Sequence, residues 1–333
     1  MKLLYIARTT APEKVTLPRF QSALRQVADV TLLENGEQFD PETLCAHMRS
    51  TDVLLTDWRS VPLPAELAEA PGNLRYVCHL TGSIQKIIPE EIIRAGIPVT
   101  NWGDAPSMEL AESALTLLLA VLKDLPARIR GVEAGGWGNL TGLRQGRLHG
   151  LRVGIYGFGV SGVALYELLK PFRAKIFVYD PFVHHLPEDV TQVHTLAELF
   201  DQSHAISIHA ALTPETRKSI DADLLARLPD GAVLVNTARG DIIDQEALFA
   251  ELESGRLRAG LDVLAGKDWL PPEHPARAWP NLLLTCHQLN NGFWPDPEAL
   301  QPYHEVCLDN LRRFANGEPL RFAFDLTRMQ RST

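Results

Sequence analysis

The sequence predicts an α/β protein built from two domains, each with a parallel β-sheet. The chain has 333 residues, about twice the ~150 that are typical of one domain. Short apolar runs alternate with amphipathic stretches along most of this length, which is the pattern of strand–helix–strand units with right-handed crossovers. A glycine-rich stretch over residues 135–150 separates an earlier series of such units from a later one.

The first series contains five expected strands with helical patterns between them. The strands are Leu3–Ala7, Asp29–Leu33, Asp52–Thr56, Arg75–Leu80 and Pro98–Asn101. The helical patterns are Pro18–Val27, Pro41–Arg49, Pro64–Ala70 and Pro89–Ala95. Each of these begins with proline, whose missing N–H costs nothing in the first turn of a helix.

The second series follows a long helical stretch from Pro106 to Glu133. Its expected strands are Leu151–Tyr156, Lys175–Asp180, His204–His209, Ala232–Asn236, Ala259–Val263 and Leu282–Thr285. Its expected helices are Ser161–Lys170, Ala222–Leu228 and Gln245–Glu253, with a final helix over Ala299–Ala315. Because ligands bind beyond the carboxyl ends of parallel strands, we expect the active site in the cleft between the two domains.

Composition argues against several classes of function. A net charge of −9 argues against nucleic-acid binding, which needs clustered lysine and arginine. The longest apolar run, Ala114–Leu122, is too short to cross a bilayer, and the N-terminal residues lack the apolar stretch of a signal peptide. The four cysteines show no CxxC spacing, so neither disulfides nor a metal site is expected. We therefore expect a cytoplasmic protein without a nucleic-acid or membrane partner.

A glycine motif follows the strand that ends at Tyr156 and opens directly into a helix. It consists of Gly157, Phe158, Gly159, Val160, Ser161 and Gly162. The first glycine permits a tight turn, the second allows close approach of a pyrophosphate, and the third allows helix and strand to pack closely. Asp180 ends the next strand, where a carboxylate accepts hydrogen bonds from the adenosine ribose and repels a 2′-phosphate. The motif predicts a Rossmann-like domain that binds NAD.

Two side chains that suit redox chemistry follow later strands. Arg239 lies just past the strand that ends at Asn236, and its planar guanidinium matches a carboxylate bidentately. His287 follows the strand LLLTC, and a neutral imidazole suits proton exchange near neutral pH. Gly82 and Ser83, after an earlier strand, are candidates to bind substrate through backbone N–H groups. These residues predict hydride transfer between a nicotinamide and a small 2-hydroxy or 2-oxo acid.

The chain resembles the D-isomer-specific 2-hydroxyacid dehydrogenases, which include glycerate, lactate, phosphoglycerate, phosphite and formate dehydrogenases. The resemblance covers nearly the whole chain through ordered segments such as LTGSIQKI, LHGLRVGIYGFGVSG, LVNTARGDIIDQEAL and LLLTCH. It implies a discontinuous substrate domain over residues 1–105 and 296–333, and a Rossmann-like NAD domain over residues 106–295. Two Rossmann-like or flavodoxin-like domains and a homodimer formed largely through the NAD domains are implied as well.

The resemblance also implies roles for individual residues. Arg239 binds and polarises the substrate, and His287 is the acid/base. Thr237, Ala238 and Asp262 lie along the nicotinamide half of the cofactor, with Val160 and Ser161 under the pyrophosphate.

One departure from the family concerns the carboxylate that pairs with the catalytic histidine. The family places a glutamate five residues after the position of Asp262, but Lys267 stands there. Asp268 can take the glutamate's role if the loop shifts by one residue, Glu273 can swing in, or the pair is absent. Lys267 itself can bind an extra anionic group, act as a reactive amine or simply project into solvent.

Further departures cluster around the substrate. Cys286 replaces the usual proline before the histidine, and Trp58, Arg59, Lys86 and Asn290 are candidate specificity residues. They leave two functions open. The first is an NAD-dependent oxidoreductase acting on a small acid. The second is an NAD(H)-binding protein whose chemistry is lost or altered.

Overall fold

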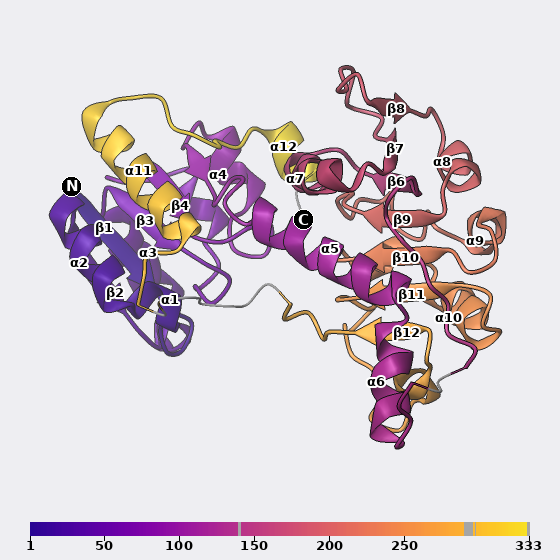
Figure 1. The fold of residues 1–333 in the computed structure, drawn as a ribbon. Coiled ribbons are helices and arrows are strands. Elements are labelled where there is room, and N and C mark those ends of the chain that lie inside the picture. The colour runs from indigo at the N-terminus through magenta and orange to yellow at the C-terminus, as the bar shows by residue number, and fades with distance from the viewer. Residues whose placement is uncertain (139–140, 290–295, 297, 332–333) are drawn as a thin grey trace. The chain divides into compact units, whose positions relative to one another are not determined.

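The computed structural model describes residues 1–138, 141–289, 296 and 298–331 (Figure 1). The chain forms two compact α/β units, one of Met1–Pro106 with Phe293–Thr333 and one of Ser107–Gly292. Each unit is built on a single sheet in which all paired strands are parallel. The predicted fold class of two parallel-sheet α/β domains is therefore confirmed.

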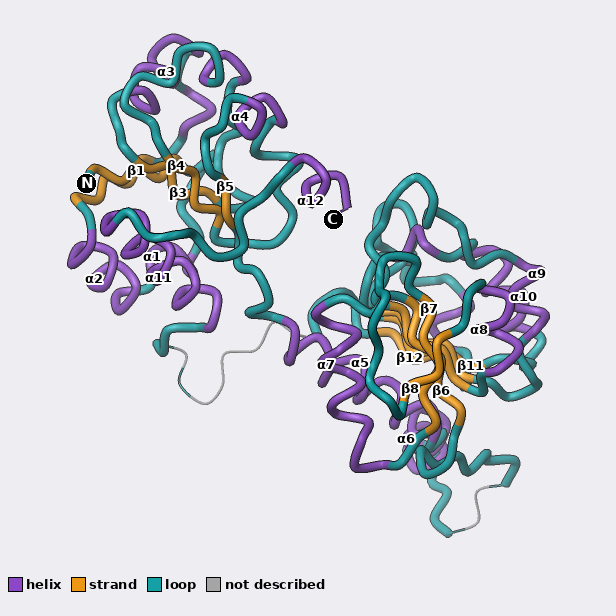
Figure 2. The backbone as a smooth tube through the Cα atoms, turned by 90° about the horizontal axis from the view of Figure 1, so that it is seen from above, coloured by secondary structure: helices purple, strands orange, loops and turns teal. Residues whose placement is uncertain are grey.

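The first unit holds a five-stranded sheet in the order β2-β1-β3-β4-β5. Its strands are β1 (Lys2–Ile6), β2 (Asp29–Leu33), β3 (Val53–Thr56), β4 (Tyr76–His79) and β5 (Val99–Thr100). One face packs against α1 (Glu13–Thr16), α2 (Pro18–Val27) and α11 (Pro302–Asn316), and the other against α3 (Pro41–Arg49) and α4 (Glu90–Arg94) (Figure 2). A last helix, α12 (Leu326–Arg331), packs near α4.

The second unit holds a seven-stranded sheet in the order β12-β11-β10-β9-β6-β7-β8. Its strands are β6 (Arg152–Tyr156), β7 (Lys175–Tyr179), β8 (Val190–Gln192), β9 (Ala205–Ile208), β10 (Val233–Asn236), β11 (Arg258–Leu261) and β12 (Leu282–Leu284). The chain order reverses between β6 and β9. In open α/β sheets, ligands bind at such a reversal, outside the carboxyl ends of the strands.

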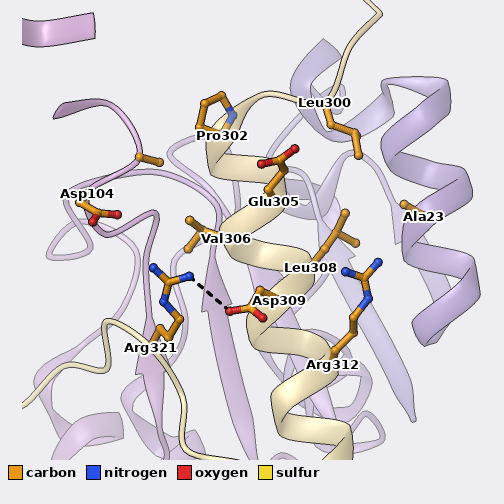
Figure 3. Close-up of a pocket in the computed structure, with 11 residues that line it drawn as sticks. Ala23, Asp104, Leu300, Pro302, Glu305, Val306, Leu308, Asp309, Arg312 and Arg321 are labelled. Carbon is orange, nitrogen blue, oxygen red and sulfur yellow. Dashed lines mark ion pairs between the residues drawn. The ribbon is translucent and has the colours of Figure 1, made fainter. Parts of the chain in front are cut away.

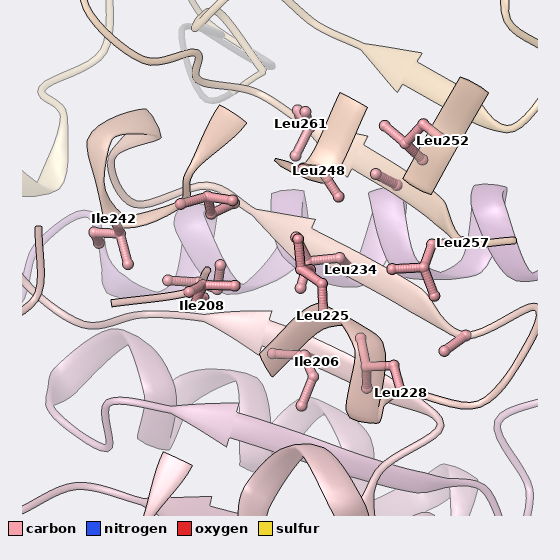
Figure 4. Packing of buried hydrophobic residues seen from close by; sticks show 14 of the residues in the cluster. Ile206, Ile208, Leu225, Leu228, Leu234, Ile242, Leu248, Leu252, Leu257 and Leu261 are labelled. Carbon is pink, nitrogen blue, oxygen red and sulfur yellow. The ribbon is translucent and has the colours of Figure 1, made fainter. Parts of the chain in front are cut away.

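Helices cover both faces of this second sheet. On one side lie α5 (Ser107–Leu122) and α7 (Val160–Leu169), and on the other lie α8 (Leu196–Gln202), α9 (Ala222–Arg227) and α10 (Gln245–Glu253) (Figure 2). Leu225 of α9 and Leu228 just after it pack onto Leu234 of the sheet, together with Leu248 and Leu252 of α10, in the core that Figure 4 shows. With helices on both faces, the central strands are buried and read as continuous apolar runs.

Short 3-10 helices complete the described structure at Gly36–Gln38, Ala65–Leu67, Lys170–Phe172, Gly240–Ile242 and Pro275–Ala278. The expected helix Pro64–Ala70 is therefore only a 3-10 turn. The strand Val190–Gln192 and the helix Leu196–Gln202 are absent from the sequence prediction, because both are short and carry little periodicity.

The long helical stretch expected from Pro106 to Glu133 is divided into two helices in the structure. Helix α5 ends at Leu122, and α6 runs over Leu125–Glu133. Asp124 between them adopts left-handed φ and ψ of 50° and 35°. Pro126 explains the break, since a proline ring in a continuous helix would collide with the carbonyl of Leu122. No helix within the described ranges combines the length and the apolar character needed to cross a membrane.

Candidate active site

The glycine motif forms a tight turn between β6 and α7. Gly157 has φ +90°, and a Cβ there would approach Ala210 N to 2.5 Å. A Cβ on Gly162 would come within 2.2 Å of Gly157 O, so the helix packs directly against the turn. A Cβ on Gly159, by contrast, would meet nothing within 4 Å. The three glycines thus differ: two are required by close packing, and the third leaves open space above the backbone.

Asp180 follows β7 and contacts the same turn. Its Oδ2 accepts a hydrogen bond from Phe158 N at 2.7 Å, and its Oδ1 accepts one from Phe182 N at 2.9 Å. Val160 begins α7 and is 57% exposed. The first amides of α7 have no intrahelical acceptors and carry the positive end of the helix dipole. Open space at Gly159, this helix start and the Asp180 carboxylate together fit the pyrophosphate and ribose of a dinucleotide.

A second loop, residues 237–239, follows β10 and carries Thr237, Ala238 and Arg239. It is held by Asn236, which sequence reasoning did not single out. Asn236 is fully buried; its Nδ2 donates to Arg239 O at 2.8 Å, and its Oδ1 accepts from Ala238 N at 2.9 Å. An Asn that ends an apolar strand and precedes a turn is the signal that could have identified it.

Gly240, the residue after Arg239, allows a third loop, residues 264–268, to approach closely. A Cβ on Gly240 would lie 2.0 Å from the backbone carbon of Leu264, so only glycine allows this approach. The loop is further fastened by hydrogen bonds from Ala265 N to Gln245 Oε1 at 2.8 Å and from Gly266 N to Asp241 Oδ1 at 3.1 Å. Asp268 on this loop is thereby brought close to Arg239.

Asp268 contacts the predicted acid/base. Its Oδ2 lies 2.5 Å from His287 Nδ1, while its Oδ1 accepts from Leu264 N at 2.5 Å. An ionised carboxylate can only accept, so Nδ1 carries the proton and Nε2 is left for a substrate. The His287 side chain is 51% exposed and that of Asp268 is 31% exposed. Of the alternatives for the missing glutamate, the described contacts agree with Asp268.

Arg239 lies beside this pair. Burial lowers the pKa of its guanidinium, and the Asp268 carboxylate acts in the opposite direction. Arginine remains charged through such a shift. Arg239 Nη1 donates to Ala238 O at 2.7 Å, which orients the planar group within its own loop. A cation, a carboxylate and an imidazole therefore gather at the carboxyl ends of the neighbouring strands β10, β11 and β12.

Asp262 fastens the turn that carries His287. Its Oδ1 accepts hydrogen bonds from Thr285 Oγ1 at 2.6 Å and Gln288 N at 3.2 Å, and its carbonyl oxygen accepts from His287 N at 2.6 Å. Cys286 and His287 have φ of +49° and +56°. Proline cannot adopt such a value, since its ring holds φ near −65°. Cysteine at position 286 is thus compatible with this turn, whereas the family's usual proline is not.

Lys267 and Glu273 are both exposed, and among the described contacts of His287 the acidic partner is Asp268. Lys267 makes no hydrogen bond or ion pair with any described residue, in keeping with projection into solvent. Asn290 lies outside the described residues.

Gly82 and Ser83 belong to the first unit, after β4. The Ser83 carbonyl oxygen accepts a hydrogen bond from Trp58 Nε1 at 3.1 Å, and the Gly82 carbonyl oxygen accepts one from Asn101 Nδ2 at 2.8 Å. Their backbone N–H groups as substrate donors stay a prediction.

A cavity of about 510 Å³ in the same unit opens beside α11 (Figure 3). Val306 and Leu308 line it together with charged side chains, among them Arg321 and Asp309, whose Nη1 and Oδ2 are 3.5 Å apart. None of the predicted site residues lines this cavity.

The second unit is a dinucleotide-binding domain, since a parallel sheet, its order reversal and the glycine turn define that class. The family model for the NAD binding domain of the D-isomer specific 2-hydroxyacid dehydrogenases matches residues 115–288, more than half of the chain. The chain belongs to that family, and NAD is its cofactor.

Relatives agree with this assignment over longer ranges. D-3-phosphoglycerate dehydrogenase of Methanocaldococcus jannaschii is 28% identical over 311 residues, which cover 91% of this chain and 57% of that protein. The chain thus spans little more than half the length of that relative. Glyoxylate reductase of Thermofilum pendens is 31% identical over 309 residues, covering 89% and 88% of the two chains. A solved 2-hydroxyacid dehydrogenase from Ketogulonicigenium vulgare has a TM-score of 0.79 at 25% identity, covering 98% of each chain.

Proposed function

We propose that this chain catalyses the reversible reduction of a small 2-oxo acid to the 2-hydroxy acid. The observation that carries the proposal is the contact of His287 Nδ1 with Asp268 Oδ2, 2.5 Å apart, beside Arg239. This contact supports a working acid/base in a chain that lacks the usual glutamate. Bound NADH supplies the hydride in the direction of reduction.

Arg239 is proposed to bind the substrate carboxylate and to polarise the adjacent carbonyl. Its planar fork offers parallel N–H donors that match two oxygen atoms, and partial burial strengthens that attraction. The backbone N–H groups of Gly82 and Ser83 are proposed to bind the other carboxylate oxygen. As negative charge develops on the carbonyl oxygen, the fixed cation stabilises it without reorganisation.

His287 is proposed to donate a proton from Nε2 to the carbonyl oxygen during reduction and to accept it during oxidation. Asp268 supports both directions, because it holds Nδ1–H and lies close to the imidazolium that forms. Thr237, Ala238 and Asp262 are proposed to line the nicotinamide half of the cofactor, with Val160 and Ser161 beneath the pyrophosphate. Lys267, being exposed, has no part in this scheme.

Turnover of NADH across a panel of 2-oxo acids tests the proposal. We expect the wild type to oxidise NADH with at least one member, and Arg239→Ala to lower kcat/KM by about 10²-fold or more. NADH binding, followed by fluorescence, should stay unchanged in the variant. Tight NADH binding without turnover in the wild type would instead favour an NAD(H)-binding protein that has lost its catalytic activity.

We further propose a homodimer formed through the second unit. Helix α6 has no buried residue, yet Leu125, Ile129 and Val132 recur at helical spacing along it and are 44%, 50% and 46% exposed. Trp137 just beyond is 85% exposed. An apolar stripe of this kind marks a protein–protein contact.

The dimer is tested by Ile129→Asp, which places a charge in the middle of the stripe. Light scattering after size exclusion should give a dimer for the wild type and a monomer for the variant. Val163→Asp, at an exposed valine of α7, should remain dimeric. A monomeric wild type would contradict the proposal.

We propose a cytoplasmic location as well. The four cysteines are free thiols, which supports a reducing compartment.

A further inference from the structure

Lys14 in the short helix α1 carries a half-buried ammonium group in the first unit. Its Nζ lies 4.9 Å from the centroid of the Trp58 ring, a cation–π contact. Among the residues that the structure describes, none forms a hydrogen bond or ion pair with this ammonium group. Burial lowers the pKa of Lys14, and the charge of Arg59 adds to that shift. A half-buried ammonium without a hydrogen-bond or ion-pair partner retains donors that an anionic ligand can use.

Asp57 is the carboxylate whose charge acts on Lys14, but its hydrogen bonds are made with other residues. It is fully buried, and its Oδ1 accepts from Tyr5 Oη at 2.9 Å and from Arg59 N at 2.8 Å. Its Oδ2 is buried without any hydrogen-bond partner, and its charge raises the pKa of Lys14. Asp57 therefore helps to keep Lys14 protonated without binding it directly. Lys14 and Arg59 are positive and Asp57 is negative, so these three groups together carry a net charge of about +1.

This charge lies beside the loop proposed to bind the substrate. Lys14, Trp58 and Gly82–Ser83 follow β1, β3 and β4, three neighbouring parallel strands. Trp58 bridges them, because its ring lies under the Lys14 ammonium while its Nε1 donates to Ser83 O at 3.1 Å. Trp102 packs edge-on against Trp58, with 5.4 Å between ring centroids, and covers Gly82, where a Cβ would approach its Cζ2 to 2.6 Å.

We infer that Lys14 determines specificity by binding a second anionic group, a carboxylate or a phosphate ester, at the distal end of the 2-oxo acid. The inference rests on the proposed function, because it names the substrate class of that same reaction. The ammonium supplies charge, and the Trp58 ring that it lies over, supported by Trp102, supplies an apolar wall beside it. An anion at such a place gains a charge-assisted hydrogen bond.

Paired substrates that differ mainly in distal charge provide the test, with the full chain and NADH. The pairs are oxaloacetate with 2-oxobutanoate, 2-oxoglutarate with 2-oxopentanoate, and 3-phosphohydroxypyruvate with hydroxypyruvate. In the wild type we expect kcat/KM to favour the charged member of at least one pair by about 10- to 100-fold, mainly through KM. A preference in the first or second pair indicates a carboxylate as the second anionic group, and a preference in the third pair indicates a phosphate ester.

Lys14→Met should abolish that preference while leaving turnover of the uncharged member unchanged, and Lys14→Arg should restore part of it. Lys2→Met, at an exposed lysine at the opposite end of β1, serves as the matched control. Thermal melting checks that each variant folds. Equal preference in the wild type and Lys14→Met would overturn the inference, as would an equal loss on both members of a pair.

Failure of the proposed function gives a different result, namely no turnover of any 2-oxo acid by the wild type. Calorimetric titration of the same substrate pairs into NADH-loaded protein then tests the role of Lys14 in binding, independently of turnover. Tighter binding of the charged member that is lost in Lys14→Met supports it. Binding that is the same for both members overturns it.

Discussion

At the scale of single residues, the acid/base depends on which side chain of one loop reaches His287. Asp268 has φ +53°, a left-handed value that costs a non-glycine residue about 1 kcal/mol or more. Both of its carboxylate oxygens accept hydrogen bonds, from Leu264 N and from His287. Those contacts hold a conformation that turns the Asp268 side chain toward His287, while Lys267 is exposed.

Replacing Asp268 with asparagine tests its role as a positioning residue. An amide keeps the shape but removes the charge that stabilises the imidazolium. We expect kcat to fall roughly 10²-fold or more, with little change in KM or in NADH affinity. Asp223→Asn, an exposed carboxylate in the first turn of α9, is the matched control. Equal kcat in the wild type and Asp268→Asn would mean that His287 works without this carboxylate.

At the scale of elements, the glycines of the turn between β6 and α7 have two different roles, one in packing and one in cofactor binding. Gly162 lies against Gly157 O, where there is no room for a side chain, whereas Gly159 faces open space. Gly159 has φ −74°, a value that alanine also adopts, so the backbone conformation does not require glycine at this position.

Two alanine substitutions therefore have different outcomes. Gly159→Ala should fold with wild-type stability but bind NADH at least about tenfold more weakly, because its Cβ occupies the space that the pyrophosphate needs. Gly162→Ala should lower the free energy of unfolding by about 1–3 kcal/mol, because Gly157 O must move. Fluorescence titration and urea denaturation measure the two effects. Equal NADH affinity in Gly159→Ala and the wild type would contradict the proposed approach of the cofactor.

At the scale of the whole molecule, buried histidines link stability to pH. Burial lowers the pKa of His79 to about 3 and that of His304 to about 4. Both rings are satisfied in their neutral form: His79 contacts Thr56 and Thr81 hydroxyls, and His304 accepts from Gln301 N and donates to Lys14 O. Protonation of either ring would leave a buried charge in the core of the first unit.

Acid should therefore destabilise the fold well above the pH at which carboxylates titrate. An unfolded histidine binds a proton below pH about 6.5, whereas these two remain neutral in the folded state down to about 4 or lower. The stability they confer is complete above about 6.5 and is lost as the pH falls, by about 2 kcal/mol each at pH 5. Urea denaturation at pH 5 and 7.5 measures the difference.

Variants separate these histidines from other acid-sensitive groups. His79→Gln should unfold with a smaller dependence on pH than the wild type, while His194→Gln, at an exposed histidine, should match the wild type. The prediction fails if His79→Gln shows the same loss of stability between pH 7.5 and 5 as the wild type.

The sequence by itself determined the features that depend on local spacing. Apolar runs separated by amphipathic stretches predicted two parallel sheets, because backbone pairing and burial act over short segments. The spacing of Gly157, Gly159, Gly162 and Asp180 predicted NAD, since turn, helix start and second strand follow one another directly in the chain. Arg239 and His287 were recognisable because each follows a strand.

Tertiary structure decided what depends on contacts between distant segments. Which carboxylate reaches His287 follows from Gly240 admitting the loop of residues 264–268, and from the left-handed turn at Cys286. The position of the Lys14 ammonium over Trp58 was invisible in the sequence, because Lys14, Trp58 and Ser83 follow β1, β3 and β4, strands far apart in the chain. Loop conformation and desolvation are set by packing of the whole unit, whereas strand and helix patterns are set by neighbouring residues.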